Sequence, residues 1–278
     1  MPQVRENAYG GKRVHIVPTS LDREQVGYLF DEFAADRVII LDNEDPKGLE
    51  GIEGLPIRRT VQAVSERTRC FATNDVEYES TDFYQFENAL PDVFRIIYRE
   101  SLKGNDVIVN LAGGTKPVAI ALSFASSLAN AGRLFYTAKS YTEGSEGEAA
   151  ASPVPGEPIS TPFVSTPLLI LNLNNEVPTQ EQEQLFLIGL WNANEPMGVR
   201  DLLVSMDLIS EEPPAEEEKK EERTRMIQRY HRYASNLVDG GFCIKKDSVY
   251  ELTETGKQIS EIVEIMREVE KEVNSQEN

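Results

Sequence analysis

Residues Val109 to Gly132 read VNLAGGTKPVAIALSFASSLANAG, in which an apolar run, a turn of small residues and a long helical segment follow one another. The apolar run ends at Asn110 and predicts a strand, and the glycines after it allow the backbone to turn sharply. Thr115 suits the N-cap of the following helix, and Pro117 suits its first turn. A strand that passes through such a turn into a helix is the repeating unit of a parallel α/β sheet.

The first half of the chain repeats this alternation of strand-like apolar segments and helix-like amphipathic segments. Such alternation implies right-handed crossovers and a Rossmann-like, mostly parallel sheet with helices on both faces. Strands are expected at Arg13–Ser20, Asp36–Asp45, 75–80, 105–110 and Gly132–Tyr141. Further helices are expected at 21–34, 56–70 and 83–102, the last of them disturbed by Pro91.

A change of composition separates this half from the rest of the chain. Residues 142–162 are rich in Gly, Ser, Pro and Glu and predict an exposed loop or linker. The apolar run Pro167–Asn174 predicts one more strand. This strand would complete a first domain at residues 1–174 and leave 175–278 as a second domain.

The second domain has the pattern of a winged helix-turn-helix. Helices are expected at 179–193, 196–208, 223–241 and 257–273. The acidic insert at 210–222 predicts a disordered or fraying loop. Between the last two helices, residues 242–256 alternate like two short strands around a turn at Lys246–Asp247.

The net charge of −19, from 47 acidic against 28 basic residues, restricts the partners that the protein can have. The charge fits either a well-solvated surface or adaptation to a salty cytoplasm. In both cases the overall field repels nucleic acid, so DNA binding must depend on a local basic surface.

The remaining composition points to a cytoplasmic protein without a metal centre. Cys70 and Cys243 are far apart, which argues for a reducing compartment and against a disulfide framework or a zinc site. The only histidines, His15 and His231, exclude a histidine-rich metal centre. No apolar window is long enough for a membrane span, and the first residues lack the apolar core of a signal peptide.

Lys116 is the unusual residue of the glycine turn. Ligands of parallel α/β sheets bind beyond the carboxyl ends of the strands, where Gly113 and Gly114 let a ligand approach the backbone. A lysine beside the positive end of a helix costs about 0.3–1 kcal/mol, unless an anion binds to both. The alternative is a simple tight turn with Lys116 in water. The turn is neither a P-loop nor a GxGxxG fingerprint.

With the opening segment RVHIVPTSLD and the second domain, this turn makes the chain resemble CRISPR-associated Rossmann-fold (CARF) regulators that carry a winged helix, including haloarchaeal ones. The resemblance implies a homodimer that binds a cyclic oligoadenylate, often the four-membered ring, on the dimer axis. No other cofactor is implied. The small side chains of the helix after the turn fit either packing against a second subunit or burial in one subunit.

The resemblance also implies which residues bind the ligand. The turn would supply Asn110, Ala112, Gly113, Gly114, Thr115 and Lys116. The loop after the first strand would supply Thr19 and Ser20. The expected function is a ligand-responsive, CRISPR-associated transcriptional regulator.

Double-stranded DNA is the expected macromolecular partner of the second domain. The segment 223–233 has four arginines and no acidic residue, and it lies on the helix expected to enter the major groove. The candidate contacts to bases or phosphates are Arg223, Arg225, Gln228, Arg229, Arg232 and, at the wing, Lys245 and Lys246. Tyr230 and Tyr233 are expected to belong mainly to the core.

Two enzymatic alternatives stay open. CARF domains are also joined to HEPN ribonucleases, whose loose Arg–His pattern is met here by Arg225 and His231. These nucleases are wholly helical, whereas residues 242–256 predict a hairpin. A CARF half could also cleave its own ring, with Lys116 steadying a phosphate, but no general base is evident in the sequence. We therefore expect no catalytic residues.

Overall fold

The computed structural model describes residues 11–43, 54–70, 73, 75–138, 159–161, 178 and 180–276. The chain divides into two compact units, one of Met1–Ile170 with Val273–Asn278 and one of Leu171–Glu272. The strand expected at Pro167–Asn174 lies outside the described residues, and so does most of the expected linker.

The first unit contains a six-stranded sheet in the order β3-β2-β1-β4-β5-β6. Its strands are β1 (Arg13–Pro18), β2 (Arg37–Asn43), β3 (Val76–Thr81), β4 (Asp106–Asn110), β5 (Arg133–Ala138) and β6 (Ile159–Thr161). The first five are parallel, as the sequence predicted, and their order is that of a Rossmann-like sheet. β6 runs antiparallel to β5, with Tyr136 opposite Thr161.

The strand β6 corrects the expectation of an irregular linker over 142–162. Polar composition gave no sign of a strand there. Backbone pairing with β5 supplies the hydrogen bonds of this short strand, and such pairing depends on a distant segment rather than on local sequence.

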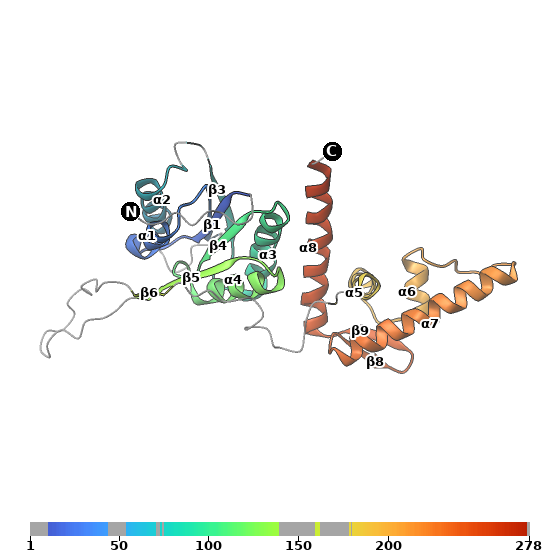
Figure 1. Ribbon diagram of the computed structural model, residues 1–278. Helices are drawn as coiled ribbons and strands as arrows, with labels where there is room; N and C mark the ends of the chain where they lie inside the picture. The colour runs from blue at the N-terminus through green and yellow to red at the C-terminus, as the bar shows by residue number, and fades with distance from the viewer. Residues whose placement is uncertain are drawn as a thin grey trace, which may run out of the picture. The chain divides into compact units, whose positions relative to one another are not determined.

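Four helices cover the two faces of this sheet: α1 (Arg23–Glu32), α2 (Leu55–Arg67), α3 (Phe86–Leu102) and α4 (Lys116–Leu128). Figure 1 shows α1 and α2 on one face and α3 and α4 on the other. Pro91 lies inside α3 without ending it, contrary to the expected disturbance. Burial of Phe94 and Ile97 by α3 offsets the one backbone hydrogen bond that Pro91 cannot make.

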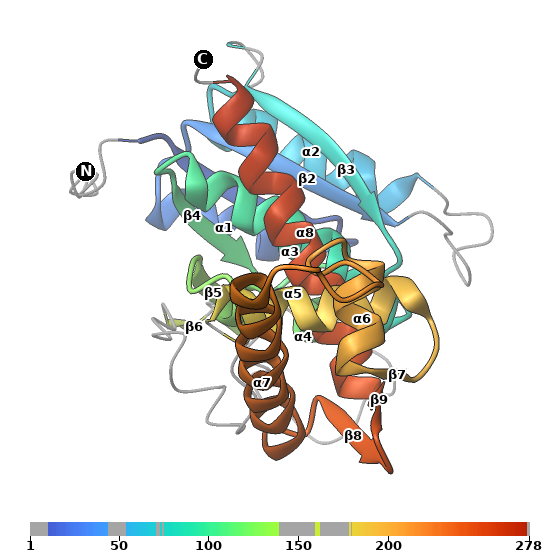
Figure 2. The ribbon, with the colours of Figure 1, turned by 90° about the vertical axis from the view of Figure 1, so that its right-hand side faces the viewer.

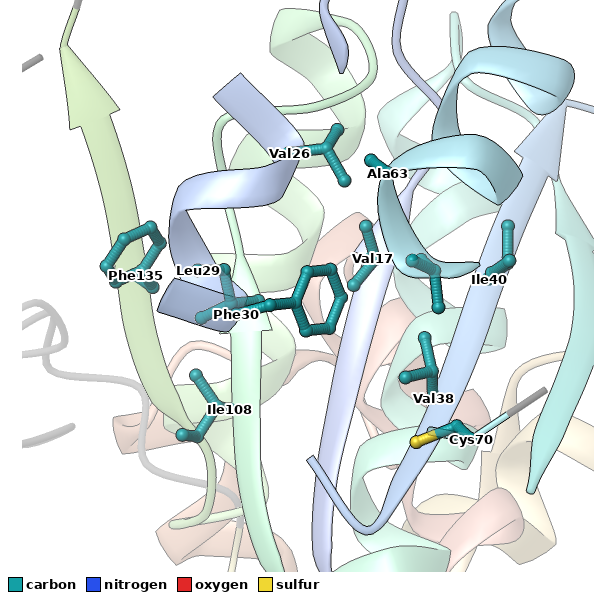
Figure 3. Packing of buried hydrophobic residues seen from close by; sticks show 11 residues of the cluster. Val17, Val26, Leu29, Phe30, Val38, Ile40, Ala63, Cys70, Ile108 and Phe135 are labelled. Atoms are coloured by element: carbon teal, nitrogen blue, oxygen red, sulfur yellow. The ribbon is translucent and has the colours of Figure 1, made fainter. Parts of the chain in front are cut away.

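The core of the first unit lies between the sheet and these helices. β1 is buried along its whole length, as a central parallel strand covered on both faces should be. The cluster beneath α1 and α2 is drawn in Figure 3, where Phe30 of α1 extends toward the strands. It consists of Val17, Val26, Leu29, Phe30, Val38, Ile40, Ala63, Val64, Cys70, Ile108 and Phe135.

The second unit combines helices with a small antiparallel sheet. Its elements are α5 (Glu181–Ala193), β7 (Met197–Gly198), α6 (Val199–Ser205), α7 (Glu217–Asp239), β8 (Cys243–Lys246), β9 (Val249–Leu252) and the part of α8 (Glu254–Gln276) that ends at Glu272. The sheet order is β7-β9-β8, and Figure 2 shows the β8–β9 hairpin near the end of α7. The hairpin confirms the sequence prediction, with its turn at Asp247 in the left-handed region.

The core of this unit joins the helices to the hairpin. Phe186 of α5 packs edge to face on Tyr250 of β9, with ring centroids 5.8 Å apart. Glu183 of α5 is buried and accepts a 2.8 Å hydrogen bond from the amide of Asn236 on α7. Apolar packing and one satisfied polar pair therefore fix α5 against α7.

Two expected boundaries in this unit were wrong. Met197 and Gly198 pair with β9 as a strand, so the second helix begins at Val199 rather than at 196. The acidic insert is not a loop throughout, because α7 begins at Glu217. Glutamates in a first helical turn are favourable, and Lys220 pairs with Glu217 one turn away.

In the described part of the chain, no helix has the length and apolarity needed to cross a bilayer. Across the same residues, no group of three histidine, cysteine or acidic side chains converges as metal ligands. Cys70 and Cys243 are both buried free thiols.

Candidate ligand-binding site

A recess of about 410 Å³ lies at the carboxyl ends of the parallel strands. We call it the strand-end recess. Its lining comes from the turns that lead into all four helices of the first unit: Thr19, Ser20, Leu21, Asp22, Gln25, Asp42, Asn43, Gly54, Pro56, Ile57, Phe83, Tyr84, Ala112, Gly114 and Thr115. The position is the one at which open parallel sheets bind ligands, and the volume suits a small organic molecule.

The glycine turn and the turn after β1 are in direct contact. A Cβ on Gly113 would lie 2.3 Å from the carbonyl oxygen of Pro18, a distance that only glycine tolerates. Gly114 has a φ of +70°, and its N–H donates a 3.0 Å hydrogen bond to the carbonyl oxygen of Thr19. Both glycines are therefore required by the geometry of this wall of the recess.

Thr19 and Ser20 form the floor between β1 and β2. Thr19 is almost fully buried, and its hydroxyl donates a 3.0 Å hydrogen bond to a carboxylate oxygen of Asp42. The backbone N–H of Ser20 donates to the hydroxyl of Thr60 on α2 at 2.9 Å. These contacts hold the first loop in place before any ligand binds.

Thr115 occupies the N-cap of α4, as predicted, but its side chain makes no cap hydrogen bond. Its hydroxyl instead donates to the carbonyl oxygen of Phe83 in the turn after β3. The backbone N–H of Phe83 in turn donates to the side-chain oxygen of Asn43 at 3.0 Å. Thr115 thus joins two loops of the recess.

Three residues expected at the site do not line the recess. Gly113 is buried against Pro18. Asn110 is fully buried at the end of β4, and its side-chain oxygen accepts a 2.8 Å hydrogen bond from the N–H of Ala112. Lys116 is exposed at the start of α4, next to the lining residue Thr115. No carboxylate of the described residues forms an ion pair with it.

Sequence reasoning missed two groups around the recess. The first is Phe83 and Tyr84, which bring aromatic surface from the turn after β3. The second is Arg58 and Arg59 in the first turn of α2, a helix that has no acidic residue in that turn. The Gly-Leu-Pro-Ile-Arg-Arg sequence from Gly54 was a usable signal, because it places a cationic first turn after a glycine N-cap and an early proline.

Ion pairs occupy the amino ends of the parallel strands, opposite the recess. Glu100 is fully buried and accepts hydrogen bonds from Arg37 at 2.9 Å, Lys103 at 3.0 Å and Asn105 at 2.8 Å. Burial alone raises the pKa of the Glu100 carboxyl, but the Lys103 hydrogen bond and the charge of Arg37 outweigh it, so the pKa lies below its usual value.

The basic face of α7 is largely exposed. Arg225, Gln228, Arg229 and Arg232 all reach solvent. The guanidinium of Arg225 donates a 3.1 Å hydrogen bond to Glu221, which lies in the acidic first part of the same helix. Tyr230 is buried, in agreement with the prediction that it belongs to the core.

Arg223 and the two lysines of β8 make contacts within the protein. Arg223 is half-buried and donates a 3.1 Å hydrogen bond to the carbonyl oxygen of Glu211. Lys245 lies over the ring of Tyr250, with the ammonium nitrogen 5.6 Å from the ring centroid. Lys246 forms a 2.7 Å ion pair with Glu251 across the hairpin.

Among curated proteins, none matches this sequence. The solved structures that resemble the chain at low identity include the following three. Can2 from Sulfobacillus thermosulfidooxidans, in complex with cyclic tetra-adenylate, is 14% identical with a TM-score of 0.32, covering 90% of this chain and 63% of its own. Csm6 from Enterococcus italicus, bound to cyclic hexa-2'-fluoro-hexa-dAMP, is 12% identical with a TM-score of 0.39, covering 96% and 78%. Protein VC1899 from Vibrio cholerae is 10% identical with a TM-score of 0.31, covering 91% and 66%.

This chain thus spans less than two thirds of the length of the Can2 chain. A family model matches the part of the chain that carries the strand-end recess. The matching residues are 13–142, from β1 to just beyond β5, and the model is described as "HFX_2341_N:-like, N-terminal".

Proposed function

We propose that this protein is a CRISPR-associated transcriptional regulator that binds a cyclic oligoadenylate in its first unit and double-stranded DNA through its second. The strand-end recess, with the Gly-Gly-Thr-Lys turn at its rim, carries the proposal. A parallel sheet has its ligand site at this edge, and the turn brings to it the start of α4, which has no side-chain cap hydrogen bond, and an exposed ammonium group.

A homodimer is the form in which such a ring is best bound. A cyclic oligoadenylate of two-fold symmetry presents its phosphates in matched pairs, and an isologous dimer presents two copies of one loop. Lys116 from each subunit would meet the ring from opposite sides. On the same helix, Ile120 is half-exposed among small side chains, which suits contact with a second copy.

The second unit supports DNA binding by its order of elements. α5, β7, α6, α7 and the β8–β9 hairpin follow one another as in a winged helix-turn-helix, with α7 as the recognition helix. Its exposed Arg225, Gln228, Arg229 and Arg232 would contact bases and phosphates. Arg223, Lys245 and Lys246 already make contacts within the protein, so they would contribute less to DNA binding than these four residues.

The proposal assigns no nuclease role to α7. Arg225 and His231 are six positions apart, which turns them about 240° around the helix axis, so the two side chains leave α7 in different directions. Cleavage of the ring by the first unit would need a general base, and the acidic side chains among the described lining residues are Asp22 and Asp42. Product analysis with labelled ring tests that possibility directly.

Calorimetric titration of the protein with cyclic tetra-adenylate tests whether this ligand binds. Lys116→Ala should weaken binding by about tenfold or more, as expected for a charge-assisted contact to phosphate. Lys271→Ala is the matched control, because it removes an exposed lysine of α8. Absence of binding to the wild-type protein would refute the proposal, and equal affinities of the two variants would remove Lys116 from the site.

A duplex carrying the promoter of the protein's own operon tests the second half of the proposal. Affinity measured by fluorescence anisotropy should change when cyclic tetra-adenylate is added, because a ligand shifts an equilibrium only if the two states bind it differently. Sedimentation of the free and bound protein reports the dimer. Unchanged DNA affinity would refute the proposed regulation by the ligand.

A further inference from the structure

The strand-end recess is acidic inside and basic at its rim. We infer that it holds an uncharged nucleoside portion of the ligand, while Arg58 and Arg59 of α2 bind the adjoining phosphate outside it. The inference rests on the proposed function for the identity of the ligand. It goes beyond that function by dividing the ligand between two surfaces of one chain and by naming a phosphate-binding pair.

The interior of the recess disfavours phosphate. Among the described residues that line it, the charged ones are Asp22 and Asp42, and none is a lysine or an arginine. Asp22 caps α1, where it accepts a 3.1 Å hydrogen bond from the N–H of Gln25. It therefore offsets the positive end of that helix, which would otherwise attract an anion. A phosphate inside would lose water and gain like charges.

A nucleoside suits the same interior. Leu21, Ile57, Phe83 and Tyr84 supply apolar and aromatic surface on which a planar base can stack. The carboxylate of Asp42 is held in place by the hydroxyl of Thr19 and can accept hydrogen bonds only. Amino and hydroxyl groups, which a base and a ribose both offer, are its complementary donors.

Two arginines of α2 touch the lining of the recess from outside. The guanidinium of Arg59 donates a 2.8 Å hydrogen bond to the carbonyl oxygen of Leu21. The guanidinium of Arg58 donates a 3.0 Å hydrogen bond to the carbonyl oxygen of Gly54. Leu21 and Gly54 both line the recess, so both guanidinium groups lie at its edge. Each has several N–H donors, of which this bond uses one, and both side chains are exposed.

Phosphate is the natural ligand for these groups. Arginine binds phosphate through parallel N–H donors. Arg58 and Arg59 each bond a carbonyl oxygen of a lining residue, so either guanidinium can offer its remaining donors to a phosphate at the rim. A nucleotide seated with its base in the recess would reach the rim with its phosphate. The ribose would lie near Thr19 and Asp42, where its hydroxyls find acceptors.

The test uses adenosine, AMP and inorganic phosphate as probes on the full-length protein. Affinities come from calorimetry and saturation-transfer NMR. In the double variant R58Q/R59Q, which retains hydrogen-bonding side chains, AMP should lose about tenfold in affinity and adenosine less than about twofold. R69Q is the matched control, since Arg69 is an exposed arginine just beyond the opposite end of α2. D42N should weaken adenosine and AMP by similar factors.

Several outcomes would overturn the inference. It fails if adenosine does not bind, if R58Q/R59Q weakens adenosine as much as AMP, or if inorganic phosphate displaces adenosine. Thermal unfolding of each variant shows that lost affinity is not lost folding. Cyclic tetra-adenylate separates this inference from the proposed function. Ring binding that R58Q/R59Q leaves unchanged refutes the inference alone, whereas the expected AMP and adenosine results without ring binding refute the proposed function alone.

Discussion

Gly113 packs so closely on Pro18 that a Cβ at Gly113 would lie 2.3 Å from the carbonyl oxygen of Pro18. Rotation of a side chain cannot relieve a contact between two backbones. Gly113→Ala should therefore push the turn after β1 away and lower the free energy of unfolding by about 1–3 kcal/mol. Thermal and denaturant unfolding measure this loss.

Gly104→Ala provides the comparison for this variant. Gly104 does not line the recess and has a φ of +72° with open space around it, so an added methyl group strains the backbone without displacing a neighbour. Its cost should be about 1 kcal/mol, and the turn after β1 should stay in place. Equal binding of cyclic tetra-adenylate by both variants would show that the Gly113 contact does not shape the recess.

Glu100 should control the acid stability of the first unit. Its pKa is lowered in the folded protein, so its contribution to stability is present above the unfolded pKa and is lost as pH falls through the folded pKa. Glu100→Gln removes the buried partner of Arg37 and Lys103. Because Arg37 keeps its ion pair with Glu77 and Lys103 is partly exposed, the cost at pH 7 should be about 1–3 kcal/mol. The difference from the wild-type protein should shrink toward pH 3.

Unfolding curves between pH 3 and pH 7 test this prediction. Glu66→Gln is the matched control, because Glu66 pairs with Arg23 at 3.4 Å on the surface. It should change stability far less, since exposed ion pairs contribute little. A constant difference between Glu100→Gln and the wild-type protein across this pH range would contradict the role of the Glu100 charge.

The sequence predicted the parallel sheet well because its signals are local. The run from Val109 to Gly132 contains a strand, its turn and its helix in one continuous segment. β6 gave no such signal, since Ile159–Thr161 depends on pairing with a strand that lies more than twenty residues away in the chain. The helical acidic segment after Glu216 was readable in principle, because its Glu–Lys spacings are those of helical ion pairs.

In the candidate site, too, the residues that were predicted come from one local motif, and those that were missed come from distant segments. Gly114 and Thr115 were predicted and line the recess, because one motif places them at the end of a strand. Phe83 and Arg59 come from two other turns, and only the folded sheet brings them to the same edge. The acceptor of the Thr115 hydroxyl was also unpredictable, since Phe83 precedes it by more than thirty residues.

His15 should make the stability of the first unit depend on pH in the mildly acidic range. The ring is fully buried on β1 and stacks on Phe30, and neither ring nitrogen has a hydrogen-bond partner among the described residues. Burial, aided by the charges of Arg13 and Arg133, lowers the pKa of His15 from 6.5 to about 3. The unfolded chain therefore binds a proton between these values while the folded protein does not.

Stability should fall by about 1.4 kcal/mol for each pH unit below 6.5 because of this one group. His15→Leu removes the proton-binding site and should flatten the stability curve between pH 6 and pH 4. His231→Gln is the control, since His231 is the other histidine and is exposed on α7. Parallel curves for His15→Leu and the wild-type protein would mean that His15 binds its proton when folded.

If α7 binds DNA as proposed, Glu221 should weaken that binding by holding the guanidinium of Arg225, 3.1 Å away on the same exposed helix. Glu221→Gln frees Arg225 for phosphate and should raise the affinity for duplex DNA about twofold to fivefold at low salt. The gain should fade near 0.15 M salt, where screening acts over about 8 Å. Glu254→Gln is matched in charge, since Glu254 pairs with Lys257 at 2.7 Å on α8. Anisotropy titrations compare the two variants, and equal gains would mean that net charge alone, rather than release of Arg225, sets the affinity.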